Sequence, residues 1–356
     1  MNRRRITLGA AAAGVVAGAV GIGFLAAPAG AGQSPTLPGT TPAALVQSVL
    51  TSSPPAMSGT VAITNNLGLP AVPGLPAALA GGNNNQIRVW TDGVHGSRIS
   101  LPTPTSEETI IDDGTTVYDW NSATRTVTEH HLNKADGKTA HKAEPAKPDT
   151  SNANLDPASV ARQLVSSVRQ TSTISVDGTD VVANRPAYDL VLTPKPSQRT
   201  LLRQVRIAVD AQTHMPLQLT VLANNTNTPA LQIGFNSIDI GPQDPALFRF
   251  SVPAGATVTN GDNKDKQSVD TANQTAPSIV GSGWETVVVM HLPSSMGQSG
   301  KGPDPMRLVQ EFGKPISGSW GTGSLISTDV GNALVTSDGR VAAGFVPTQL
   351  LIKALG

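Results

Sequence analysis

The sequence predicts an α+β fold built on an antiparallel sheet, followed by a small C-terminal α+β domain. Short runs rich in β-branched and aromatic residues alternate with turn residues such as Asp92-Gly93, which is typical of an antiparallel meander. Two other segments place apolar residues at helical spacing. Residues 259–276 are polar and nearly free of large apolar side chains, so they predict a linker that precedes a C-terminal domain over residues 277–356.

Charge and cysteine content exclude several classes of protein. The 356 residues carry 25 basic and 25 acidic side chains, so the formal net charge is zero. A chain without a basic excess lacks the electrostatic field that holds nucleic acid, and we expect no nucleic-acid partner. Cysteine is absent, which excludes disulfides, thiolate metal sites and the lipidated cysteine of a bacterial lipoprotein.

The N-terminus has the pattern of a signal peptide over residues 1–31. Arg3, Arg4 and Arg5 precede an uncharged Ala/Gly/Val-rich run, and Ala29-Gly30-Ala31 provides a small-residue cleavage site. The paired arginines also fit the twin-arginine route. The alternative is an uncleaved N-terminal anchor, because the apolar run is just long enough to span a bilayer. Either alternative predicts an extracytoplasmic location, secreted or in the cell envelope, with residues 32–40 as a flexible tether.

Two helices are expected in the first domain. Thr41 and Pro42 are suited to the N-cap and the first helical position, and an apolar stripe follows from Leu45. Asp156 and Pro157 begin a second helix with an apolar face.

Ten strands are expected between and after these helices, with a mobile surface loop over residues 132–154. They cover residues 59–64, 86–91, 97–101, 109–111, 116–120, 124–131, 187–193, 202–209, 217–222 and 231–238. The segment 248–255 closes this domain.

The C-terminal domain is expected to contain a strand, a helix, a hairpin and a terminal helix. The strand covers residues 284–289 and the helix covers residues 304–312. The hairpin turns at Asp338-Gly339, and the terminal helix starts at Pro347.

The order of these elements resembles that of the LolA/LolB-type lipoprotein carrier superfamily. That superfamily is related to the mycobacterial lipid-binding lipoproteins and to the N-terminal domain of RseB. The opening helix that runs into Ser58-Gly59-Thr60-Val61 carries the resemblance, as do the segments 87–119 and 187–253. Together these stretches place a LolA-like lipid- or lipoprotein-binding domain over residues 41–258.

The resemblance implies a half-open antiparallel β-barrel with helices covering its concave face. It implies an apolar cavity for lipids or for the acyl chains of lipoproteins, and a role in transport. The physical chemistry of a curved sheet agrees, since alternate strand residues line whatever part of the concave face the helices leave unfilled.

Ten large strand residues are candidates for the ligand-binding lining of this cavity. They are Trp90, Ile99, Ile111, Tyr118, Trp120, Leu190, Leu192, Ile207, Leu219 and Phe235. The alternative for each is ordinary core packing, because such side chains are usually buried in any case. A register shift of one residue would also move a whole strand's set to the other face.

An uncharged segment follows the first strand. Its apolar residues are Leu67, Leu69, Val72, Leu75 and Leu79, interrupted by three prolines. It is either an apolar loop that covers the cavity or dips into a membrane, as the LolB resemblance implies, or a loop that folds back onto its own core.

Signals for chemistry are weak. His130 and His131 are adjacent on a strand and point to opposite faces, so they do not share a metal easily. Glu107-Glu108 and Asp112-Asp113 are expected to be solvated loop residues. Motifs of zinc proteases, serine hydrolases and P-loops are absent from the sequence, and we expect no catalytic residues, no metal and no cofactor.

Three functional hypotheses follow from these observations. The first is an extracytoplasmic carrier or sensor that binds lipids or lipoprotein acyl chains. The second is an RseB-like regulator of a membrane-bound partner of the anti-sigma type, which the C-terminal domain favours. The third is a hydrolase, for which the sequence offers no catalytic constellation.

Overall fold

A computed structural model describes seven segments of the chain. They are residues 34–66, 86–102, 105–132, 157–224, 226–261, 278–291 and 313–356. The predicted signal peptide, the apolar loop from Leu67 to Leu79, residues 133–154 of the predicted surface loop and the predicted helix over 304–312 lie outside them. Within the described segments, none of the helices has the length and hydropathy needed to cross a membrane.

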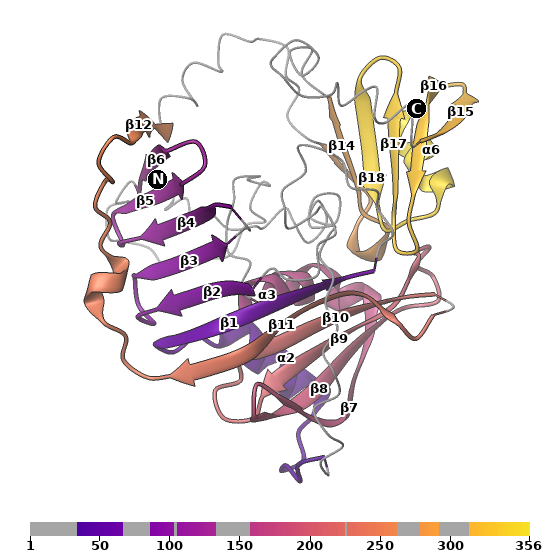
Figure 1. The fold of residues 1–356 in the computed structure, drawn as a ribbon. Coiled ribbons are helices and arrows are strands. Elements are labelled where there is room, and N and C mark those ends of the chain that lie inside the picture. Colours follow the sequence, from indigo (N-terminus) through magenta and orange to yellow (C-terminus); the bar gives the residue numbers. More distant parts are fainter. Residues whose placement is uncertain are drawn as a thin grey trace, which may run out of the picture.

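A twelve-stranded sheet dominates the structure (Figure 1). Its strands follow the spatial order β12-β6-β5-β4-β3-β2-β1-β11-β10-β9-β8-β7, so β12 and β7 are its edges. All neighbouring strands are antiparallel except β12 and β6, which are parallel. The first half comprises β1 (Met57–Asn65), β2 (Gln86–Thr91), β3 (Ser97–Pro102), β4 (Glu107–Asp112), β5 (Thr116–Asn121) and β6 (Thr126–His131). The second half comprises β7 (Ser172–Val182), β8 (Arg185–Pro194), β9 (Leu202–Asp210), β10 (Pro216–Ala223), β11 (Pro229–Ile240) and β12 (Thr257–Asn260).

Two helices pack on one side of this sheet. The predicted cap of α2 (Pro42–Thr51) is confirmed, because the hydroxyl of Thr41 accepts a hydrogen bond from the Ala44 amide at 3.2 Å. The second helix, α3 (Pro157–Val168), buries a stripe that includes Leu164 and Val168. It continues into a 3-10 turn, η2 (Arg169–Thr171). We call the side of the sheet that carries these helices the covered face.

The main core lies between α2, α3 and the covered face. Its members include Leu45 and Val49 of α2, Leu164 of α3, and Leu190 and Ile207 of the sheet. These side chains are almost inaccessible to solvent. Burial of an aliphatic side chain contributes about 1.5–3 kcal/mol, so this layer accounts for much of the stability of the sheet.

The segment that precedes α2 is attached to the same region. Thr179 donates a hydrogen bond to the Pro35 carbonyl at 2.7 Å, and the Tyr188 hydroxyl donates one to the Pro38 carbonyl at 2.9 Å. Leu37 packs on the main core between these two contacts. Residues 34–40 of the predicted tether are therefore held against β7 and β8.

Strand β7 was missed from the sequence. Its burial pattern is irregular, because a bulge between Val176 and Thr179 accommodates Gly178 at a φ of 88°. As an edge strand it also carries several exposed polar residues. Both features disturb the alternation of apolar and polar residues by which strands are recognised in a sequence.

The segment 248–255, which was predicted to close this domain, is irregular apart from the end of a 3-10 helix. A 3-10 helix, η3 (Pro245–Phe248), begins at Asp244, whose side chain accepts a hydrogen bond from the Ala246 amide at 2.8 Å. Irregular chain then leads to β12. Thr259 and Asn260, where the predicted linker begins, lie in β12.

A second sheet of six strands forms the C-terminal part. Its order is β13 (Ser278–Val280), β14 (Val287–His291), β18 (Arg340–Gly344), β17 (Asn332–Thr336), β16 (Gly321–Ser327) and β15 (Lys314–Gly318). The helix α6 (Thr348–Leu355) packs on it and shares a separate core with Leu334 and Trp320. The predicted hairpin at Asp338-Gly339 is confirmed, with Gly339 at a φ of 87°.

The predicted strand over 284–289 begins too early. Gly281 and Gly283 adopt φ values of 85° and 59°, and these left-handed conformations turn the chain before the strand. Trp284 therefore lies in a 3-10 turn, η5 (Gly283–Glu285), and β14 starts at Val287.

Candidate ligand-binding groove

The ten predicted lining residues divide between the two faces of the large sheet. Six of them lie on the covered face and belong to core clusters that include α3. They are Ile99, Leu190, Leu192, Ile207, Leu219 and Phe235. Each is at most 6% exposed, and Leu190, Leu192 and Ile207 are completely buried. At these positions the side chains are packed as core.

The other four lie on the opposite face. Ile99 pairs with Val89 across β2 and β3, and side chains alternate along a strand, so Trp90 and its partner Arg98 point the other way. Ile111 pairs with Arg98, and Tyr118 pairs with Ile111. Trp120 shares their face because it lies two residues beyond Tyr118. The structure does not bring these four residues to the covered face.

The segment after β11 contacts this opposite face. The rings of Tyr118 and Phe250 stack with centroids 4.9 Å apart, and a Cβ built at Gly96 would lie 2.7 Å from the ring of Phe248. The guanidinium groups of Arg88 and Arg98 lie 5.7 and 5.8 Å from the centroid of the Trp90 ring. On the opposite face, Tyr118 and Trp90 are therefore engaged in ring stacking and cation–π contacts.

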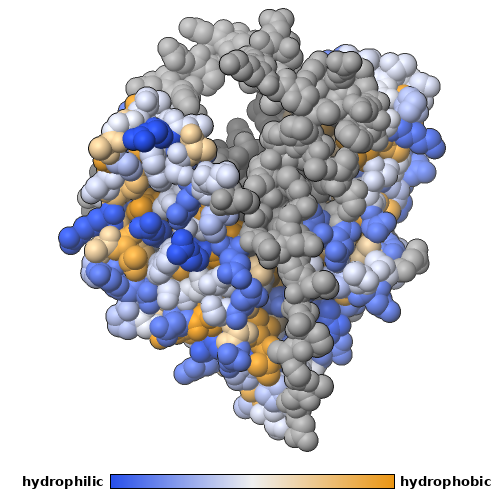
Figure 2. All heavy atoms as spheres, in the orientation of Figure 1, coloured by the Kyte–Doolittle hydropathy of each residue, from blue (hydrophilic) through white to orange (hydrophobic). Residues whose placement is uncertain are grey.

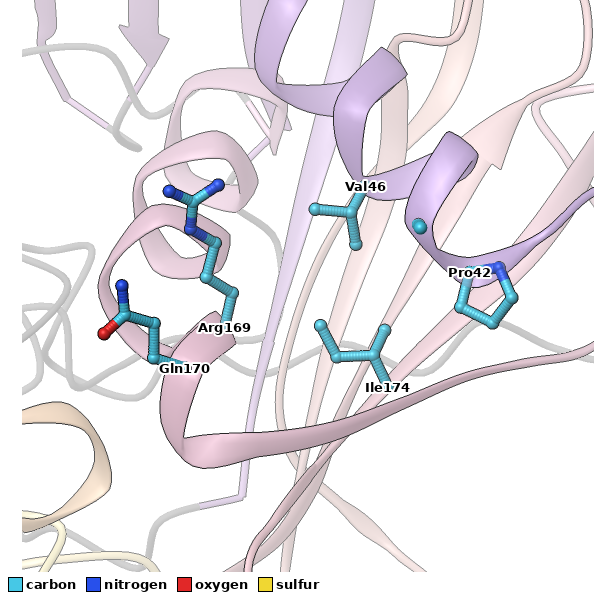
Figure 3. Close-up of a pocket in the computed structure, with 6 residues that line it drawn as sticks. Pro42, Val46, Arg169, Gln170 and Ile174 are labelled. Atoms are coloured by element: carbon cyan, nitrogen blue, oxygen red, sulfur yellow. The ribbon is translucent and has the colours of Figure 1, made fainter.

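A groove opens between α2 and the start of β7 (Figure 3). Pro42, Ala43 and Val46 of α2 form one side, and Ile174 of β7 forms the floor. Arg169 and Gln170 of η2 form the other side. In Figure 3, Val46 and Ile174 face each other across the space. The groove has a volume of about 480 Å³ and is lined mostly by apolar surface. We call it the α2–β7 groove.

The α2–β7 groove lies beside the main core. Val46 belongs to both, and Ile174 packs against that core from the edge strand. Figure 2 shows that the visible described surface is mostly hydrophilic, with small hydrophobic patches. The groove is an open, mostly apolar depression at the edge of the large sheet.

Positive charge collects at the η2 side of the groove. Arg169 lines it, and Lys195 donates a hydrogen bond to the Gln170 carbonyl at 2.8 Å. The sequences of α2 and α3 contain no aspartate or glutamate. The groove therefore combines apolar walls with a cationic rim.

The acidic pairs and histidines are placed apart from this groove. Glu107 and Glu108 begin β4 instead of lying in a loop, because β4 extends two residues further toward the N-terminus than expected. Burial, together with the charge of Asp119, raises the pKa of Glu108. His130 and His131 lie on β6 as predicted. Within the described segments, no three His, Asp or Glu side chains form a group that could hold a metal ion.

Neither the groove nor its charge pattern was found from the sequence. The groove is formed by residues far apart in the chain, and Ile174 lies on the strand that was missed. The available signal was the absence of carboxylates from two amphipathic helices, the second of which ends directly before Arg169.

Comparisons with known proteins give likenesses of fold only. No protein-family model matches the chain, and no curated protein matches it in sequence. The MucA/MucB complex of Pseudomonas aeruginosa is similar in structure, with 15% identity and a TM-score of 0.40 over 87% of this chain and 93% of that chain. A LolA superfamily protein from Nitrosomonas europaea has 10% identity and a TM-score of 0.25 over 60% of this chain and 99% of that chain. An uncharacterized conserved protein from Thermus thermophilus has 11% identity and a TM-score of 0.35 over 61% of this chain and 98% of that chain.

One of these structures is a LolA superfamily protein, and the sequence of the present chain resembles that superfamily. At these identities and TM-scores the likenesses do not establish a function.

Proposed function

We propose that the chain binds an amphiphile with an acyl chain, such as a lipid or the lipid moiety of a lipoprotein, in the α2–β7 groove. The observation that carries the proposal is the groove itself, which combines apolar walls with the cationic Arg169 at its rim. Its volume of about 480 Å³ falls within the range of about 300–1,000 Å³ that is usual for small-molecule sites. A binding role without catalysis, in an extracytoplasmic compartment, is part of the proposal.

The place of the ligand differs from the one that a half-open barrel implies. Such a barrel would hold the acyl chain under the covered face, where Leu190, Leu192 and Ile207 are completely buried. A close-packed core has no space for a ligand without rearrangement. We therefore place the acyl chain in the groove beside this core, with its anionic head group at Arg169.

A substitution that fills the groove tests the proposal. Ala43 lines the groove and is exposed, so Ala43→Trp introduces a large ring there without entering the core. Ala44 is also exposed on α2 but does not line the groove, which makes Ala44→Trp the matched control. Titration of a fluorescent fatty-acyl probe should give at least tenfold weaker binding for Ala43→Trp and unchanged binding for Ala44→Trp. Absence of probe binding by the wild-type chain, or equal binding by all three proteins, would contradict the proposal.

A second candidate is an RseB-like regulator of a membrane-bound partner. The observation that favours it is the C-terminal sheet, which has its own core and packs beside η2. A simple carrier does not require this additional unit. Co-purification of the full chain with detergent-solubilised envelope proteins tests this candidate. A partner whose release depends on added lipid would support it, whereas the absence of any stoichiometric partner would count against it.

A further inference from the structure

Trp284 connects the C-terminal sheet to the end of α3. Its side chain is 4% exposed, and its indole N–H donates a hydrogen bond to the Ser172 hydroxyl at 2.9 Å. Ser172 in turn donates a hydrogen bond to the carbonyl of Val168, the last residue of α3, at 2.7 Å. Both bonds are buried, so a buried indole N–H without its bond to Ser172 would pay the desolvation cost of an unsatisfied donor.

The backbone beside Trp284 packs directly on η2. Gly283 adopts a φ of 59°, and a Cβ at this position would overlap the side chain of Thr171. Trp284, Val330 and Phe345 of the C-terminal part also belong to or pack against the main core under α2 and α3. The C-terminal sheet therefore completes the core of the large sheet at this end.

A second set of contacts lies beside the first. The Leu201 amide and the Thr200 hydroxyl both donate hydrogen bonds to the Phe345 carbonyl at 2.8 Å. The Arg199 amide donates one to the Glu285 carboxylate at 2.8 Å, and the Arg199 guanidinium adds another at 3.2 Å. The Arg199 side chain is largely exposed, so this ion pair contributes little, and the buried Trp284 is the main contact.

The groove and this contact share the three residues of η2. Arg169 and Gln170 line the groove, and Thr171, the next residue, packs against Gly283. Because η2 has only three residues, a single peptide bond joins Gln170 at the groove to Thr171 at the contact. The backbone of η2 therefore links the rim of the groove directly to the surface on which Gly283 and Trp284 rest.

We propose that occupancy of the α2–β7 groove and docking of the C-terminal sheet are coupled through η2, with Trp284 as the positioning residue. The docked sheet holds Arg169 and Gln170 in the geometry that forms the groove, so docking strengthens binding of the amphiphile. By thermodynamic reciprocity, the bound amphiphile strengthens docking by the same factor. This inference rests on the proposed acyl-binding function of the groove.

Removal of the indole donor tests the coupling. Trp284→Phe keeps an aromatic ring but loses the hydrogen bond to Ser172, and it should weaken binding of a fluorescent fatty-acyl probe about fivefold. Trp320→Phe is the matched control, because Trp320 is also buried, in the turn between β15 and β16, and its indole N–H has no hydrogen-bond partner among the described residues. Ser172→Ala removes the acceptor instead, and combining it with Trp284→Phe should add little to either single effect.

Hydrogen exchange measures the reciprocal effect in the full wild-type chain. The probe should slow exchange of the peptide that contains Gly283–Glu285, and this protection should be lost in Trp284→Phe. A merely structural tryptophan would not produce ligand-dependent protection. If the wild type and Ala44→Trp bind the probe and Trp284→Phe binds it equally well, the coupling is wrong and the acyl-binding proposal stands. If the wild type binds no probe, the acyl-binding proposal fails, and the coupling fails with it.

Discussion

Substitution of Leu192 distinguishes a packed core from a ligand cavity on the covered face. Leu192 is completely buried in the cluster that joins the sheet to α2 and α3. Truncation of a buried leucine to alanine removes its transfer free energy and leaves a cavity, at a cost of about 2–5 kcal/mol. Because helices and strands surround Leu192, we expect Leu192→Ala to lower the free energy of unfolding by about 3 kcal/mol. Binding of a fatty-acyl probe in the α2–β7 groove should remain unchanged.

Urea unfolding followed by circular dichroism measures this loss. Val181→Ala is the control, since Val181 is 53% exposed, and its truncation should change the free energy of unfolding by less than about 0.5 kcal/mol. A cost below about 1 kcal/mol for Leu192→Ala, together with tighter probe binding, would refute the packed core. It would place the ligand under the covered face.

Three further predictions concern the ligand, a buried ion pair and the opposite face. Fatty acids of increasing length should displace the probe with an affinity that rises about twofold per methylene and then levels off. This factor corresponds to about 0.4 kcal/mol, half of the roughly 0.8 kcal/mol for full burial of a methylene, because the groove is open on one side. An affinity that does not depend on chain length would count against an acyl site. Burial raises the pKa of Asp210, but hydrogen bonds from Arg185 and Thr213 outweigh it and hold this pKa below its ordinary value. A lowered folded-state pKa contributes stability above the unfolded pKa and loses it as the pH falls through the folded value. Arg185→Gln should therefore cost about 1.5–3 kcal/mol in urea unfolding at neutral pH, and the difference from wild type should shrink below about pH 4; a constant difference would show that the charge of Asp210 is not involved. A Cβ at Gly234 would lie 2.9 Å from the Gln218 side chain on the opposite face. Gly234→Trp should therefore lower the free energy of unfolding by about 1–3 kcal/mol and leave the affinity for the probe unchanged. A loss of affinity would show that the ligand binds on the opposite face.

Local signals predicted individual elements well. Strand β2 has the predicted limits, and the cap of α2 at Thr41 follows directly from the side-chain chemistry of its first residues. Prediction failed where backbone conformation or edge position masked the pattern. Gly178 interrupts the alternation of β7, and Gly283 turns the chain so that Trp284 docks on the large sheet instead of starting a strand.

The candidate site was harder to predict, because it depends on strand facing and on contacts between distant segments. Trp90 and Ile99 are equally suited to a cavity by size and hydropathy, yet the register places them on opposite faces. The groove joins Val46, Arg169 and Ile174, which no local pattern relates. Local sequence shows which residues are apolar, whereas pairing between strands decides which of them share a surface.

Photo-crosslinking locates the bound acyl chain directly. A fatty acid with a diazirine near its terminal carbon would be irradiated with the full wild-type chain, and the labelled peptides would be identified by mass spectrometry. The groove predicts labels on the peptides that contain Val46 and Ile174, with labelling lost in Ala43→Trp and retained in Ala44→Trp. Labels confined to peptides of the opposite face, such as those that contain Trp90 or Tyr118, would contradict the proposed site.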